Sequence, residues 1–143
     1  MPASTRATIL PVVTLTDEEM IDLLRRIHAA LNRSDFEAVI ALAHPDIVIA
    51  RAGGMGEVRG TAAIRDWMEP DAFESQVLEP LEYRVAGNRV LVQVIGHMRG
   101  AGSGIELDIR AWTLWTFGPD GRVTRVEVFL DHEEAEAQRA FAQ

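Results

Sequence analysis

The chain has 143 residues, of which 48% are hydrophobic and 25% are charged, a balance typical of one globular domain with a buried core. The formal net charge of -8 disfavours binding to nucleic acid or to an anionic lipid surface, and no apolar run is long enough to cross a membrane. Cysteine and lysine are both absent, which excludes disulfides, thiolate metal sites and a lysine-anchored pyridoxal cofactor.

The N-terminal segment, residues 1–14, contains one arginine and a short apolar stretch that Pro11 interrupts. This is not the pattern of a secretory signal peptide. We therefore expect a flexible or loosely docked arm at residues 1–14, a single domain at residues 15–143 and a cytoplasmic location.

Three helices are predicted in the first half of the chain. Residues 15–35 carry apolar side chains at helical spacing, and Thr16 with Glu19 forms a capping box. A shorter helix follows, which Ser34 is expected to cap and Pro45 to end. A strand at 46–50, a glycine-rich turn with an edge strand at 57–59 and a third helix at 61–68 complete this half.

The second half reads as a loop, a meander of strands and a closing helix. Residues 69–76 are the loop, the helix covers residues 131–141 with Asp131 as its cap, and the strands cover residues 77–85, 89–100, 105–117 and 122–130. Pro80 interrupts the first of these strands, whose register the pattern leaves open. The order of elements predicts an α+β fold, a curved antiparallel sheet of about five or six strands around three N-terminal helices, plus a short C-terminal helix.

Alternation along the strands predicts which face of the sheet is buried. Residues 90–98 and 107–115 are apolar at every second position, and Asp108 and Arg110 occupy the opposite parity. Burying a Val, Ile or Leu side chain contributes about 1.5–3 kcal/mol, whereas an unpaired buried charge is strongly destabilising. The apolar positions should therefore lie under the helices, and Asp108 and Arg110 should form an outward ion pair across strands or between subunits rather than a catalytic pair.

The outer face of the predicted sheet also carries large apolar side chains. A mixed surface with an aromatic centre is typical of a subunit interface. We therefore expect a homodimer through this face, with the residues Ile95, Trp112, Leu114 and Phe129.

Several stretches resemble the SnoaL-like branch of the nuclear transport factor 2-like superfamily, from about Thr16 to the C-terminus. They are "HPDIVI", "GTAAIRDW" and "GSGIELDIRAWTLWTFGPDGRVTRVEVFLDHEEA". The resemblance implies a cone-shaped α+β barrel, often dimeric, with a pocket between the helices and the concave sheet. It specifies a fold rather than a reaction, because the superfamily includes steroid isomerases, epoxide hydrolases and polyketide cyclases.

The catalytic positions of these enzymes are mostly occupied by other residue types. The three steroid-isomerase-like positions fall at Arg51 and near Ile27 and Thr113, and the epoxide-hydrolase-like positions fall at Val94, Gly96 and Val128. Those two activities are therefore not expected. Polyketide-cyclase-like members use an Asp and a His around the pocket. No concave strand position supplies either, which leaves loop and helix residues as the alternative.

Two residues are candidates for catalysis. Arg51 follows the first strand, where its planar guanidinium would bind a carboxylate, enolate or phenolate; the alternative is a solvated arginine, or one paired with Glu57 or Asp66. His28 lies beside the apolar stripe of the first helix, where a neutral imidazole would act as a base or a hydrogen-bond donor. The alternative for His28 is a half-buried side chain at the helix flank.

The remaining candidates are walls of a ligand pocket, for which plain core packing is the alternative: Trp67, Val94, Met98, Thr113, Trp115 and Val128. A metal site is not expected, because no pair of histidines at suitable spacing accompanies an inward carboxylate. The chain is thus predicted to bind a small hydrophobic molecule, as a cofactor-free acid–base enzyme of the isomerase, cyclase or lyase type on a hydrophobic carbonyl compound. The alternative is a non-catalytic ligand-binding or dimeric accessory protein.

Overall fold

The structure, a computed structural model, describes residues 14–68 and 73–143. The predicted N-terminal arm, residues 1–14, lies outside the described residues except for Thr14. None of the described helices is long and apolar enough to cross a membrane. The elements are, in chain order, α2 (Asp17–Asn32), α3 (Phe36–Leu42), β1 (Ala43–Ala50), the 3-10 turn η1 (Ala52–Gly54), β2 (Glu57–Arg59), α4 (Ala62–Met68), β3 (Phe73–Ala86), β4 (Arg89–Gly100), β5 (Glu106–Phe117), β6 (Val123–Leu130), the 3-10 turn η2 (Asp131–Glu133) and α5 (Glu134–Ala142).

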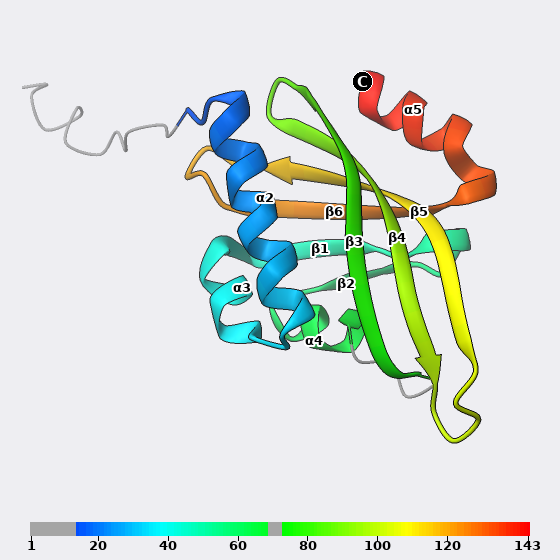
Figure 1. The fold of residues 1–143 in the computed structure, drawn as a ribbon. Helices are drawn as coiled ribbons and strands as arrows, with labels where there is room; N and C mark the ends of the chain where they lie inside the picture. The colour runs from blue at the N-terminus through cyan, green and yellow to red at the C-terminus, as the bar shows by residue number, and fades with distance from the viewer. Residues whose placement is uncertain (1–13, 69–72) are drawn as a thin grey trace, which may run out of the picture.

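The α+β fold class predicted from the element order is confirmed, with one difference in the sheet. Six strands form one curved sheet in the order β2-β1-β6-β5-β4-β3 (Figure 1). β1 pairs with β6 in parallel, whereas the other neighbours are antiparallel. The sheet is therefore mixed rather than purely antiparallel, because β1 and β6 run in the same direction.

The predicted N-terminal cap is confirmed for α2 and is wrong for α3 and α5. The Thr16 hydroxyl accepts from the backbone N–H of Glu19, and the Glu19 carboxylate accepts from that of Thr16, as predicted. α3 is capped by Asp35, because Ser34 takes a left-handed conformation with φ of 59°. The predicted cap Asp131 instead begins η2, and α5 starts at Glu134.

The parity of the strands is as predicted, and it separates a concave from a convex face. Val90, Val92 and Val94 of β4 are buried in one core with side chains of α2, α3 and α4. Asp108 lies on the convex face, where it pairs with His97 across the β4–β5 ladder rather than with Arg110. The concave face therefore holds the main core.

The convex face carries a second core, which buries two of the four residues of the predicted dimer surface. Trp112 and Leu114, only 4% and 1% exposed, pack with Ala137 of α5 and are enclosed within the chain itself. α5 is held there because Arg89 donates to the Ala140 carbonyl at 2.6 Å. Of the four residues predicted to face a partner subunit, only Ile95 and Phe129 remain partly exposed.

Candidate functional site

The concave face has an inner part that is closely packed beneath the helices. We define it by the strand residues Val90, Val92, Val94, Thr113, Trp115 and Val126, all of which are buried. The indole of Trp67, from α4, lies 6.1 Å from that of Trp115 between ring centroids. A cavity of only about 10 Å³ remains beside these two rings, which is about the least that a single water molecule requires.

Thr113, the polar residue in the middle of the inner part, holds Trp115 in place. Its hydroxyl accepts from the Trp115 indole N–H at 2.9 Å and donates to the Val92 carbonyl at 3.5 Å. The hydroxyl proton and the indole proton are thus both committed within the protein.

His28 projects from α2 toward this packed interior and is 2% exposed. Its Nδ1 lies 2.7 Å from the carbonyl oxygen of Leu24, one helical turn earlier. Desolvation by burial lowers the pKa of His28 below 6.5, and the hydrogen bond to Leu24 opposes this only in part. The imidazole is therefore neutral at physiological pH.

The second ring nitrogen of His28 has a different environment. Nε2 is fully enclosed and has no hydrogen-bond partner among the residues that the structure describes. The ring makes edge contacts with Trp115 and with Tyr83, at centroid distances of 5.5 and 6.4 Å. A polar nitrogen thus lies among aromatic side chains in the main core.

Tyr83 belongs to the same cluster, although no role could be assigned to it from the sequence. The register of β3 shifts between Pro80 and Glu82, and Tyr83 then pairs with Val92 and faces the concave side. Burial raises the pKa of the Tyr83 phenol, and the Arg25 guanidinium, 5.6 Å from its ring centroid, opposes this more weakly. The orientation of Tyr83 depends on where the bulge lies. A proline in a strand indicates an irregularity but does not fix its size, so the sequence alone does not predict this orientation.

Beyond the helices, the concave face continues as an apolar outer part that is open to solvent. Leu107 is 44% exposed, although its partner across the ladder is Met98 on the concave face. Met98, Ile109 and Val128 are half-buried. Gly96 lies in the middle of these residues and is itself buried, with the Met98 methyl 2.9 Å from the position of an added Cβ. The outer part consists of Gly96, Met98, Leu107, Ile109, Val128 and Leu130.

Arg51, unlike His28, is exposed to solvent. Its side chain is exposed in the turn between β1 and β2, where the guanidinium donates to the Met55 carbonyl at 2.5 Å. The two predicted catalytic residues are therefore not brought into one site, because His28 is enclosed beneath α2 and Arg51 faces solvent.

A larger groove, of about 670 Å³, lies at the opposite end of the sheet. It runs between the start of α2 and the β3–β4 and β5–β6 turns, with Leu15, Met20 and Phe117 among its walls. None of the described residues that line it is titratable. Nor are three His, Asp or Glu side chains grouped to hold a metal ion anywhere in residues 14–68 and 73–143.

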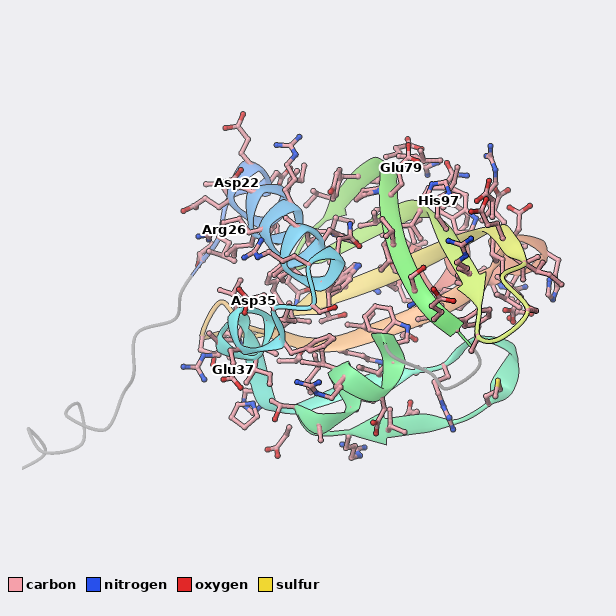
Figure 2. The ribbon with its side chains drawn as sticks, turned by 60° about the horizontal axis from the view of Figure 1, so that its bottom comes forward. Asp22, Arg26, Asp35, Glu37, Glu79 and His97 are labelled. Atoms are coloured by element: carbon pink, nitrogen blue, oxygen red, sulfur yellow. The ribbon has the colours of Figure 1, made fainter. Side chains whose placement is uncertain are left out.

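On the convex face, His97 bridges two carboxylates on neighbouring strands. Its Nδ1 lies 2.7 Å from Asp108 and its Nε2 lies 2.8 Å from Glu79. Figure 2 labels His97 and Glu79. These hydrogen bonds, first that of Glu79 and then that of Asp108, raise the pKa of His97 above 6.5. The three side chains are exposed, so they form a surface network outside the concave site.

Comparison with known proteins places the fold in a recognised group. A family model described as SnoaL-like domain matches residues 24–126. No curated protein matches the sequence.

Solved structures of the same fold include three with names that mention cyclase chemistry. The epoxide hydrolase/cyclase-like enzyme SalBIII, with a role in pyran ring formation in the polyether salinomycin, is 19% identical and has a TM-score of 0.71 over 80% of this chain and 92% of its own. A putative polyketide cyclase from Xanthomonas campestris is 21% identical, with a TM-score of 0.69 over 83% and 95%. One from Sinorhizobium meliloti is 28% identical, with a TM-score of 0.61 over 75% and 93%.

Proposed function

This chain belongs to the family of SnoaL-like domains, and we propose that it binds a small apolar molecule against the concave face of its sheet. The finer proposal is a cofactor-free acid–base reaction of the isomerase, cyclase or lyase type on a hydrophobic carbonyl compound. The structural relatives are at most 28% identical among those compared, so the proposal depends on this chain's own residues.

The observation that carries the proposal is the open outer part of the concave face. Its apolar side chains face the inside of the curved sheet, yet Leu107 is 44% exposed and Met98 and Ile109 are half-buried. Each Å² of apolar surface that a ligand removes from water there contributes about 25 cal/mol. A concave apolar surface that the protein leaves partly uncovered is the usual form of a small-molecule site.

For the reaction, His28 is the proposed base. It is neutral at physiological pH and lies against Trp115 at the inner end of the same face. Arg51 stays a separate proposal as a partner for a ligand carboxylate or enolate, since it faces solvent outside the site of His28. Among the residues that the structure describes, one nitrogen of its guanidinium is engaged, with Met55.

A non-catalytic ligand-binding or dimeric accessory protein is the second candidate. It is favoured by the packing of the inner part, where about 10 Å³ is free. It is also favoured by the lack of a carboxylate at the paired concave positions of β3, β4, β5 and β6. A homodimer stays a proposal, with Ile95 and Phe129 as its remaining members. Turnover that falls in His28→Ala and Arg51→Ala variants would favour the enzyme, and full turnover in both variants would favour the accessory protein.

The binding proposal is tested by two substitutions on opposite faces. Leu107→Glu places a charge on the outer part, and Val77→Glu places the same charge on the convex face at nearly equal exposure, 44% against 42%. With 2-methoxynaphthalene as a neutral apolar probe, titration followed by two-dimensional NMR should locate binding at Gly96 and Ile109. Leu107→Glu should weaken the affinity about tenfold or more, whereas Val77→Glu should leave it unchanged. Equal weakening by both variants, or probe shifts confined to another surface, would contradict the proposal.

A further inference from the structure

We propose that the molecule bound on the concave face carries an acidic hydroxyl group, a phenol or an enol, and donates it in a hydrogen bond to Nε2 of His28. This inference rests on the proposed binding function and adds the chemical class of the ligand. It follows from the hydrogen bonds of one buried ring.

The tautomer of His28 is fixed by its partner in the helix. Nδ1 lies 2.7 Å from the Leu24 carbonyl oxygen, and a carbonyl oxygen can only accept a hydrogen bond. Nδ1 therefore carries the proton. Because the buried imidazole is neutral, Nε2 has no proton and presents a lone pair. Only a hydrogen-bond donor can satisfy it.

Two of the neighbouring groups that could donate to Nε2 are already engaged. The Trp115 indole N–H is donated to the Thr113 hydroxyl, and the Thr113 hydroxyl proton is directed to the Val92 carbonyl. Tyr83 meets the His28 ring at its edge, with an angle of 81° between the ring planes, and its hydroxyl does not donate to Nε2. A buried acceptor left without a donor is destabilising, and a leucine of similar size would avoid it. A donor supplied by a ligand explains why an imidazole at this position is useful.

Nε2 is the ring nitrogen farther from the helix backbone, so its lone pair points away from α2 into the aromatic cluster. Trp115 separates it from Trp67, which is only partly buried and comes from the short helix α4. The proposal therefore includes rotation of the Trp67 and Trp115 rings, which joins the inner part to the open outer part and breaks the hydrogen bond from the Trp115 indole to Thr113. The ligand body then rests on apolar side chains while its hydroxyl reaches His28.

The protonation state of the ligand follows from the same environment. A phenolate or enolate has no proton to donate, and full proton transfer would place an ion pair among aromatic rings. The ligand is therefore bound as the neutral hydroxyl compound, and proton transfer to His28 belongs to the reaction step rather than to the bound state. Blocking the hydroxyl as a methyl ether removes the donor while keeping the ring system.

The test compares 2-naphthol with 2-methoxynaphthalene on the full chain. The wild type should bind 2-naphthol about tenfold more tightly, the change expected for a buried hydrogen bond. The ¹⁵N chemical shift of His28 Nε2 should move toward that of a hydrogen-bonded nitrogen with 2-naphthol only. Equal affinity for both compounds, without that shift, would overturn the inference while leaving the binding function intact. Binding of neither compound would overturn both.

Three variants locate the donor's partner. His28→Gln keeps an acceptor near the position of Nε2 and should retain the preference for the hydroxyl compound. His28→Asn reaches only the position of Nδ1, and His28→Leu has no polar atom, so both should bind the two compounds equally. Circular dichroism and melting temperature confirm folding in each case. A preference that persists in His28→Leu would refute the assignment of Nε2.

Discussion

Replacing His28 with leucine should remove an acid sensitivity that burial of this residue builds into the fold. In the folded chain desolvation holds the pKa of His28 below the 6.5 of an exposed histidine. As the pH falls below 6.5, the unfolded chain therefore takes up a proton that the folded chain does not. The free energy of unfolding must decrease with falling pH, and a leucine at this position cannot take part.

The size of the effect follows from proton linkage. One group that binds a proton only in the unfolded state changes the free energy of unfolding by about 1.4 kcal/mol per pH unit. Between about pH 6.5 and about pH 5.5 the loss reaches up to about 1 kcal/mol, because the unfolded histidine is already half protonated at the upper limit. At about pH 7.5 the variant should be within about 1 kcal/mol of the wild type, since it loses the Leu24 hydrogen bond but also the unpaired Nε2.

Urea unfolding followed by circular dichroism at three pH values measures both free energies. The quantity of interest is the difference between wild type and His28→Leu at each pH, because all other titrating groups are common to the two proteins and cancel. His97 is one of these, and its raised pKa acts in the opposite direction. A difference that stays constant between about pH 7.5 and about pH 5.5 would refute the conclusion that His28 is buried in its neutral form.

Two further predictions concern polar contacts at the sheet surface. His97 should titrate above 6.5 in a ¹H–¹⁵N NMR pH series, and both Glu79→Gln and Asp108→Asn should lower its pKa. The stabilising effect of the protonated His97 is complete below pH 6.5 and is lost as the pH rises through the pKa of the folded state. An unshifted His97 pKa in both variants would contradict the bridge. Asn32→Ala should lower the free energy of unfolding by about 1–3 kcal/mol, because the Asn32 amide both donates to and accepts from the backbone of Leu78 at 2.8 Å. Asn32→Asp keeps only the acceptor, so its free energy of unfolding, measured with urea, should fall between those of the wild type and Asn32→Ala. An Asn32→Ala variant as stable as the wild type would show that water replaces both hydrogen bonds.

The elements and the buried face could be predicted from the sequence because they depend on local patterns. The Thr16–Glu19 capping box and the alternation through Val90, Val92 and Val94 each have one structural solution. Ser34 misled because Asp35 offers the same capping chemistry one residue later. The segment Phe73–Gln76, predicted as loop, extends β3 because it pairs with the end of β4, a long-range contact that its own polar sequence does not indicate.

The site was harder to predict for reasons of packing. Trp112 and Leu114 are apolar on a face opposite the core, and the pattern does not distinguish a partner subunit from the chain's own C-terminal helix as their cover. The bulge after Pro80 decides that Tyr83 faces His28, and its size is set by the whole ladder. Helical spacing made His28 a candidate. The missing hydrogen-bond donor at its Nε2 depends on the packing of side chains from several elements, which the sequence does not indicate.

Asn32 also governs how this protein can meet other chains. β3 is an outer strand of the sheet, and such a strand offers unpaired backbone groups as a template for intermolecular β-strand addition and fibril growth. By binding the N–H and the carbonyl of Leu78 together, one side chain imitates the next strand and occupies the template at that point. A strand that paired with β3 at Leu78 would first have to displace the Asn32 side chain, so the helix that shapes the interior also blocks β-strand addition at this point of the edge.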